Sequence, residues 1–83
     1  MSFVQSHDLW WTAPFDRGPE DRPQPHLVNI VRHGLTHLAV AGPACVGVGL
    51  DIEGARRDLV QVFRAEGFEV IAQMPLAPPG VHG

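Results

Sequence analysis

Two histidines, His33 and His37, stand four positions apart in the sequence His-Gly-Leu-Thr-His. On a helix this spacing places two imidazoles on one face, where they could bind one metal ion with His26 or His7 as a further ligand. The helical zinc signature also requires a glutamate directly after the first histidine, and Gly34 occupies that position. The pattern therefore permits a divalent-metal site formed by His33, His37 and His26. A solvated or interface face explains the same residues.

Other residue patterns give little support for catalysis or nucleotide binding. Gly47 and Gly49 precede a candidate helix, but Ile52 replaces the third glycine of a dinucleotide fingerprint, and the chain has no lysine for a P-loop. Close packing between a strand and a helix, or a β-bulge, is the favoured explanation for the two glycines. Cys45 is the one cysteine, which excludes an intrachain disulfide and a multi-cysteine zinc site. We therefore predict no cofactor, apart from the divalent metal that the histidines could hold.

The stretch 44–74 contains the clearest signals of local structure. Residues 44–50 form a short apolar run with β-branched members, which predicts a strand. Asp51 is a good helix N-cap, and apolar residues at helical spacing follow it up to Gly67, which suits a left-handed helix end. Residues 68–74 then read as a second strand that stops at a proline. Two strands joined by such a helix are expected to run parallel, with a right-handed crossover between them.

Residues 25–41 allow two interpretations. As a hairpin, the segment would turn at His33-Gly34, and polar side chains would fall on both faces of the sheet. As a helix, it gathers its polar residues on one arc and nearly all of its apolar residues on the opposite arc. Pro25 suits a first helical turn, and the Gly-Pro pair after the segment suits a helix end. A glycine in a helix interior costs about 1 kcal/mol relative to alanine, but the helix explains the pattern better and is our prediction.

Residues 1–24 show no sustained period, and we interpret them as an irregular arm that ends in a Pro-rich linker. Trp10, Trp11 and Phe15 form an aromatic cluster in this arm and are the candidate interface residues. Buried aromatic side chains contribute strongly both to small cores and to interfaces. The arm is therefore expected to dock, most simply over the chain's own core and alternatively into a partner. Residues 75–83 are rich in proline and glycine, which predicts a flexible tail.

Composition narrows the class of protein. A chain of 83 residues with a formal charge of −3 fits one small domain. All six cationic residues are arginines without a basic stripe, so nucleic acid is not an expected partner, and the lysine-free composition suggests a GC-rich bacterial genome. The uncharged stretch 33–50 contains two histidines, a threonine and a Gly-Pro pair, which argue against a membrane span. The N-terminus lacks a secretory signal pattern, so a cytoplasmic location is expected.

Together these elements predict a small two-layer α+β domain over residues 25–74, in the order helix, strand, helix, strand. Two strands make a poor sheet, so either the N-terminal arm supplies a third strand or two copies pair their strand edges. We expect the sheet to be completed by homodimerisation of this kind or by a protein partner. The function predicted first is a non-catalytic interaction or accessory module, homo-oligomeric or part of a larger bacterial assembly. The alternative is a small metal-binding protein or enzyme that uses His33 and His37. A third interpretation is a carrier of a small ligand at the dimer seam.

Overall fold

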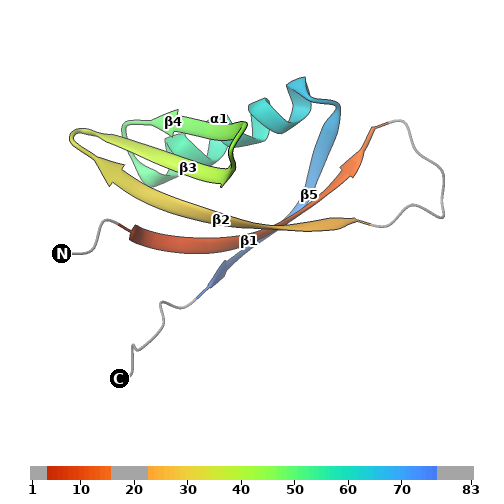
Figure 1. The fold of residues 1–83 in the computed structure, drawn as a ribbon, viewed down its shortest axis with the longest axis horizontal. Coiled ribbons are helices and arrows are strands. Elements are labelled where there is room, and N and C mark those ends of the chain that lie inside the picture. Colours follow the sequence, from red (N-terminus) through yellow and green to blue (C-terminus); the bar gives the residue numbers. More distant parts are fainter. Residues whose placement is uncertain (1–3, 16–22, 77–83) are drawn as a thin grey trace.

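The computed structural model describes residues 4–15 and 23–76. The elements in this part of the chain are β1 (Val4–Pro14), β2 (Gln24–His33), β3 (Thr36–Gly42), β4 (Cys45–Gly49), α1 (Ile52–Ala65) and β5 (Phe68–Leu76). The strands form one sheet in the order β4-β3-β2-β1-β5, and every neighbouring pair is antiparallel. Helix α1 lies on one face of this sheet (Figure 1). The predicted order helix, strand, helix, strand is therefore wrong.

The segment 25–41, predicted to be a helix, belongs to the hairpin of β2 and β3. Gly34 and Leu35 form its two-residue turn, and His33 pairs with Thr36 beside them. Gly34 has a φ of 65°, which suits the first position of a type II′ hairpin turn and is incompatible with an α-helix. Most polar side chains of this segment lie near the turn, where both faces of a sheet meet solvent. Their presence on both faces therefore did not argue against a hairpin.

The predicted irregular arm contains β1, which lies between β2 and β5 in the sheet. The alternation of this strand is hidden in the sequence because its inward positions include the polar residues Asp8 and Thr12, which are both buried. Bulges also interrupt its pairing with each neighbour. Residues 16–22 of the predicted linker and 77–83 of the predicted tail lie outside the described residues.

The predictions of β4, α1 and β5 as single elements are correct, but β5 continues through Pro75 to Leu76, so the predicted strand end at the proline and the start of the tail at residue 75 are wrong. The carboxylate of Asp51 accepts a hydrogen bond from the Gly54 backbone N–H at 2.7 Å, and Gly67 ends the helix region with a φ of 94°. However, β4 and β5 are the two edge strands, so α1 crosses the whole sheet and the two strands are not neighbours. The sheet is complete within one chain. Edge pairing is therefore not needed to complete it.

The core lies between α1 and the facing side of the sheet. The helix contributes three residues at i, i+4 spacing, which places them on one face. The sheet contributes residues from its three central strands, and each of these side chains is at most 3% exposed: Trp10, Val28, Ile30, Ala39, Ala55, Leu59 and Phe63. All members lie on the α1 side of the sheet, so the core is one-sided.

Two glycines bring α1 into close contact with β4. A Cβ atom on Gly47 would lie 2.4 Å from the backbone nitrogen of Leu59, and one on Gly49 would lie 2.4 Å from the backbone nitrogen of Ala55. No larger residue fits at these positions unless the helix moves. Of the two explanations that the sequence left open for these glycines, close helix–strand packing is confirmed.

Candidate interaction surface

The two faces of the sheet differ in what covers them. Successive side chains of a strand point to opposite faces, so the strand registers assign each residue to one face. On the α1 side, Val28, Ile30 and Ala39 are completely buried. On the other side no described helix or strand lies over the sheet (Figure 1). A sheet of this kind usually carries polar residues on its uncovered face.

Here the uncovered face is apolar. We define the open face as the fourteen side chains in its four middle rows; the registers also place His33 and Thr36 beyond one end of these rows and Ala13 and Glu69 beyond the other. The fourteen side chains form four rows across the sheet: Val48, Leu38 and Val31; then Val46, Val40, Asn29, His7 and Leu76; then Leu27, Leu9 and Met74; and last Pro25, Trp11 and Ala72. The turn of the β2–β3 hairpin bounds this face at one end, and Glu69, which pairs with Ala13, bounds it at the other.

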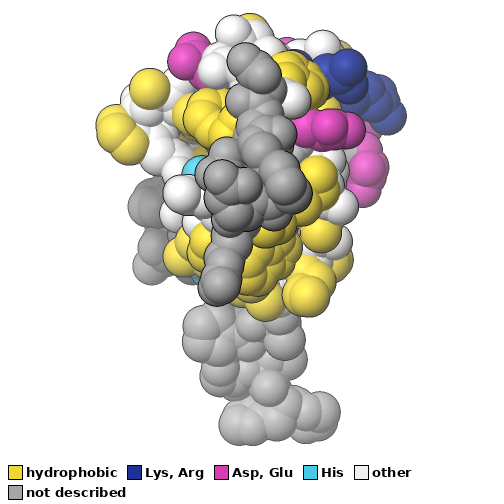
Figure 2. Space-filling model, turned by 90° about the vertical axis from the view of Figure 1, so that its right-hand side faces the viewer, with side chains coloured by type: hydrophobic (Ala, Val, Ile, Leu, Met, Phe, Trp, Pro, Cys, Tyr) yellow, Lys and Arg dark blue, Asp and Glu magenta, His cyan; other side chains and the backbone are white. Residues whose placement is uncertain are grey.

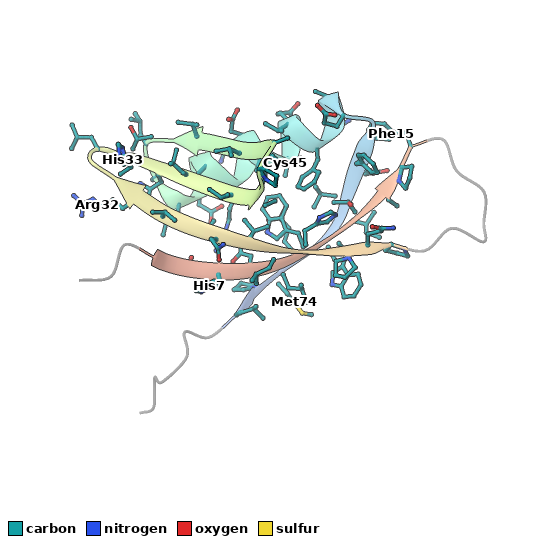
Figure 3. The ribbon with its side chains drawn as sticks, viewed as in Figure 1. His7, Phe15, Arg32, His33, Cys45 and Met74 are labelled. Carbon is teal, nitrogen blue, oxygen red and sulfur yellow. The ribbon has the colours of Figure 1, made fainter. Side chains whose placement is uncertain are left out.

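Large apolar side chains of the open face are in contact with solvent. Leu27 is 53% exposed, Val48 50% and Met74 50%. Figure 3 shows Met74 and His7 on the side of the sheet away from α1, and Cys45 on the helix side. In Figure 2 hydrophobic side chains occupy much of the lower part of the described surface, whereas the arginines and most acidic side chains lie in the upper part, where α1 is. A contiguous apolar patch of this kind marks an interaction site on most proteins that carry one.

The open face contains no Asp, Glu, Lys or Arg among its fourteen side chains. Its two polar members, His7 and Asn29, are cross-strand partners and therefore lie side by side on the middle strands. Both are only partly exposed. The surface can bury apolar groups and make a few hydrogen bonds near its middle, but it cannot form charge pairs.

Charged side chains gather instead on the helix side, where Asp8 and Arg56 form a bidentate ion pair. The Nε and Nη2 atoms of Arg56 donate to the two carboxylate oxygens of Asp8 at 2.7 and 2.9 Å, and the indole Nε1 of Trp10 donates to the same carboxylate at 3.0 Å. The hydrogen bond to Asp8 raises the pKa of Arg56 above its ordinary value. These donors of Arg56 and Trp10 all have the Asp8 carboxylate as their acceptor, so they need no ligand to bind them. The group therefore serves to fix α1 on the sheet.

A cavity of about 190 Å³ opens at the end of α1. The hydroxyl of Thr12 and the Nε2 of His26 are 2.8 Å apart in its wall, and the His26 ring packs against Phe63 with 5.1 Å between the ring centres. Cys45 and Glu66 also line it. The polar groups that are buried here satisfy each other, so the cavity shows no orphaned group that would require a ligand.

The histidines predicted to bind metal are not arranged on a helix face. His33 lies in β2 beside the turn, and His37 lies in β3 on the opposite face of the sheet, because it pairs with Arg32 rather than with His33. His26 is near the other end of β2 and contacts Thr12. Among residues 4–15 and 23–76, no group of three or more His, Cys, Asp or Glu side chains could hold a metal ion. The helical geometry on which the metal hypothesis rested is absent.

The three predicted interface aromatics have separate environments. Trp10 is completely buried in the core, where it packs against Phe63. Trp11 is on the open face and is partly exposed. Phe15 follows β1 and is 52% exposed, with the Arg64 guanidinium 5.9 Å from its ring centre. Only Trp11 of the three contributes to the open face.

Sequence reasoning missed the other members of the open face because it placed Leu27, Val31 and Leu38 on a helix. The signal for these residues is the apolar character of both alternating sets in β2 and β3, which indicates a sheet that is apolar on both sides. Ala72 and Met74 were assigned to a strand, but their face could not be known without the pairing between β5 and β1.

Within the described residues, no helix is long and apolar enough to cross a membrane. Comparison with family models, with curated proteins and with solved structures finds no significant match to this chain.

Proposed function

We propose that this chain is a small non-catalytic interaction module that works by burying the open face of its sheet against a protein. The observation that supports this proposal is the apolar, charge-free composition of that face, opposite a sheet side that already has its own helix and core. Leaving such a face in water forgoes about 25 cal/mol for every Å² of apolar surface that could be buried. A partner protein is the means by which a chain of this size gains that contribution.

The chemistry of the open face favours a protein over other partners. Nucleic acids are held through phosphate contacts with Lys and Arg, and this face has neither. Small ligands bind in concave sites, whereas the open face is one side of a continuous sheet. Another packed layer of protein fits a face of this kind, as in proteins built from two packed layers.

The same proposal makes the chain an accessory subunit in the cytoplasm. Cys45 is its one cysteine and has no disulfide partner among the described residues. A domain of this size that worked outside the cell would commonly be held together by several disulfides. Burial of the open face would stabilise the chain without disulfides, and this stabilisation does not require an oxidising compartment.

The experiment compares charged substitutions on and off the open face in extracts of the host cell. Leu27→Asp and Val48→Asp place a carboxylate on the face, and both positions are about half exposed in the single chain, so the new carboxylate can stay in contact with water. Leu35→Asp at the hairpin turn and Leu50→Asp before α1 are matched controls, since both leucines are more than four-fifths exposed and lie outside the face.

By size-exclusion chromatography of the extract, the wild type and both controls should elute well above the 9.0 kDa of a single chain. Both open-face variants should shift to the single-chain position. A wild type that elutes as a single chain, or open-face variants that elute with the wild type, would show that this surface does not mediate association.

A further inference from the structure

We infer that the occupant of the open face is a second copy of this chain, packed sheet against sheet about a twofold axis that passes through β2. This inference rests on the proposed function and names its partner. Four observations lead to it: the state of the strand edges, the extent of the face, its charge, and the position of its polar pair.

The strand edges are poorly suited to association. On β4, the outward backbone N–H of Val48 already donates to the carboxylate of Asp58 from α1, at 2.9 Å. On β5, a bulge shifts the register near Ile71, and Pro75 has no N–H to donate. Bulges, prolines and covered edges are the devices that keep sheets from pairing edge to edge. These features disfavour association through a continuous sheet at both edges, so the face is the better candidate.

The extent of the open face matches what a pair of copies requires. One position on a sheet face occupies about 32 Å², from strand spacings of about 4.8 Å and a repeat of about 6.7 Å. Fourteen positions therefore cover about 450 Å², or about 900 Å² for two copies. This is a flat area that leaves out the additional surface of side chains that project from the sheet. Long side chains such as Leu27 and Met74 add to this flat value. The sum approaches the roughly 1,000 Å² expected of a specific interface and exceeds typical crystal contacts.

The absence of charge favours an identical partner. Charged groups are the usual means by which an interface selects a different protein and rejects others. A face without charge carries no repulsion against its own copy. Two copies also have the same twist, which allows aligned packing at about 30° with about 10 Å between the sheets. Closed twofold dimers are the commonest assembly of identical chains.

The position of the axis follows from the strand order. A twofold contact that covers the whole open face with itself must have its axis at the centre of the face. The central strand of the order β4-β3-β2-β1-β5 is β2. Its open-face residues near the middle are Leu27 and Asn29. The Asn29 amide both donates and accepts hydrogen bonds, so it can pair with the same amide of a second copy. The polar pair of the face, His7 and Asn29, therefore lies close to the twofold axis, where a second copy can supply hydrogen-bond partners.

A charge-swap experiment on purified protein tests the inference. By light scattering at micromolar concentration, the wild type should have about twice the chain mass of 9.0 kDa. Leu27→Asp and Leu27→Arg should each have the single-chain mass, since like charges would meet across the axis. An equimolar mixture of the two should regain the double mass. Leu35→Asp, Leu35→Arg and their mixture should keep the double mass throughout.

A second pair, Asn29→Asp and Asn29→Arg, serves if either Leu27 variant fails to fold, which circular dichroism would reveal. A single-chain mass for the purified wild type would overturn the inference, as would variants that stay dimeric or mixtures that stay monomeric. If the purified wild type is a single chain but elutes as a larger species in the host extract, the second copy is excluded while the interaction function stands. If it is a single chain in both, both proposals fail.

Discussion

Asp8 and Arg56, 48 positions apart in the chain, are joined by two hydrogen bonds of 2.7 and 2.9 Å between carboxylate and guanidinium. This ion pair connects β1, an interior strand of the sheet, to the N-terminal half of α1. The Asp8 side chain is 1% exposed, and it also accepts from the indole of Trp10. The contact places a buried ion pair on the helix side of the sheet, whereas none of the fourteen side chains of the open face is Asp, Glu, Lys or Arg.

Replacement of Asp8 by alanine should destabilise the fold by about 3 kcal/mol, because the guanidinium and the buried indole N–H both lose their acceptor. Urea denaturation measures this change. The control is Glu53→Ala, which removes the other carboxylate on Arg56; Glu53 is 73% exposed, so a loss below about 1 kcal/mol is expected. Because the pKa of Arg56 is raised in the folded state, the stabilisation from this ion pair is fully present below the ordinary arginine pKa and is lost only as the pH rises through the raised value. Equal losses for the two variants would contradict this role of Asp8.

Substitution of Gly47 by alanine should destabilise the fold by about 2 kcal/mol, because the new methyl group would overlap the backbone of α1 at Leu59. Gly42→Ala is the matched control, since Gly42 lies in the same hairpin of β3 and β4 and nothing stands within 4 Å of its added Cβ. Denaturant midpoints of the two variants provide the comparison. A Gly47→Ala variant as stable as Gly42→Ala would show that α1 does not approach β4 closely.

Gly34→Ala separates the hairpin from the helix that the sequence pattern favoured. In a helix, this change should stabilise the protein by about 1 kcal/mol. At a φ of 65° it should instead destabilise by about 1 kcal/mol, because alanine disfavours the left-handed region. The sign of the change in unfolding free energy decides between the two structures, and we expect destabilisation.

The part of the fold that local patterns could predict is β4, α1 and β5, since an apolar run, the cap at Asp51 and the glycine at position 67 are signals within a few residues of each other. The hairpin escaped prediction because β2 is apolar on both faces, so Val28 and Ile30 on one side and Leu27 and Val31 on the other show no alternation. A continuous apolar segment does not distinguish a helix from a strand covered on both sides.

The candidate site could not be predicted because it depends on pairing between distant strands. Leu9, Leu27 and Met74 come from three strands and become neighbours only through the registers of β1 with β2 and β5. A shift of one residue in either register would move the partner strand's residues to the other face. The predicted association rested on unpaired edges of a two-stranded sheet, and the five-stranded sheet is complete within one chain. The apolar open face comes from strand pairings that no local pattern reveals.

Burial of the open face can be measured directly through Met74, whose side chain is half exposed in the single chain and lies on that face. Hydrogen peroxide converts an accessible methionine to its sulfoxide, and mass spectrometry of the peptide gives the rate. In host-cell extract, where any partner is present, Met74 of the wild type and of Leu35→Asp should oxidise several-fold more slowly than Met74 of Leu27→Asp. Oxidation of wild-type Met74 as fast as in Leu27→Asp would mean that the open face stays uncovered, which would contradict the proposed function.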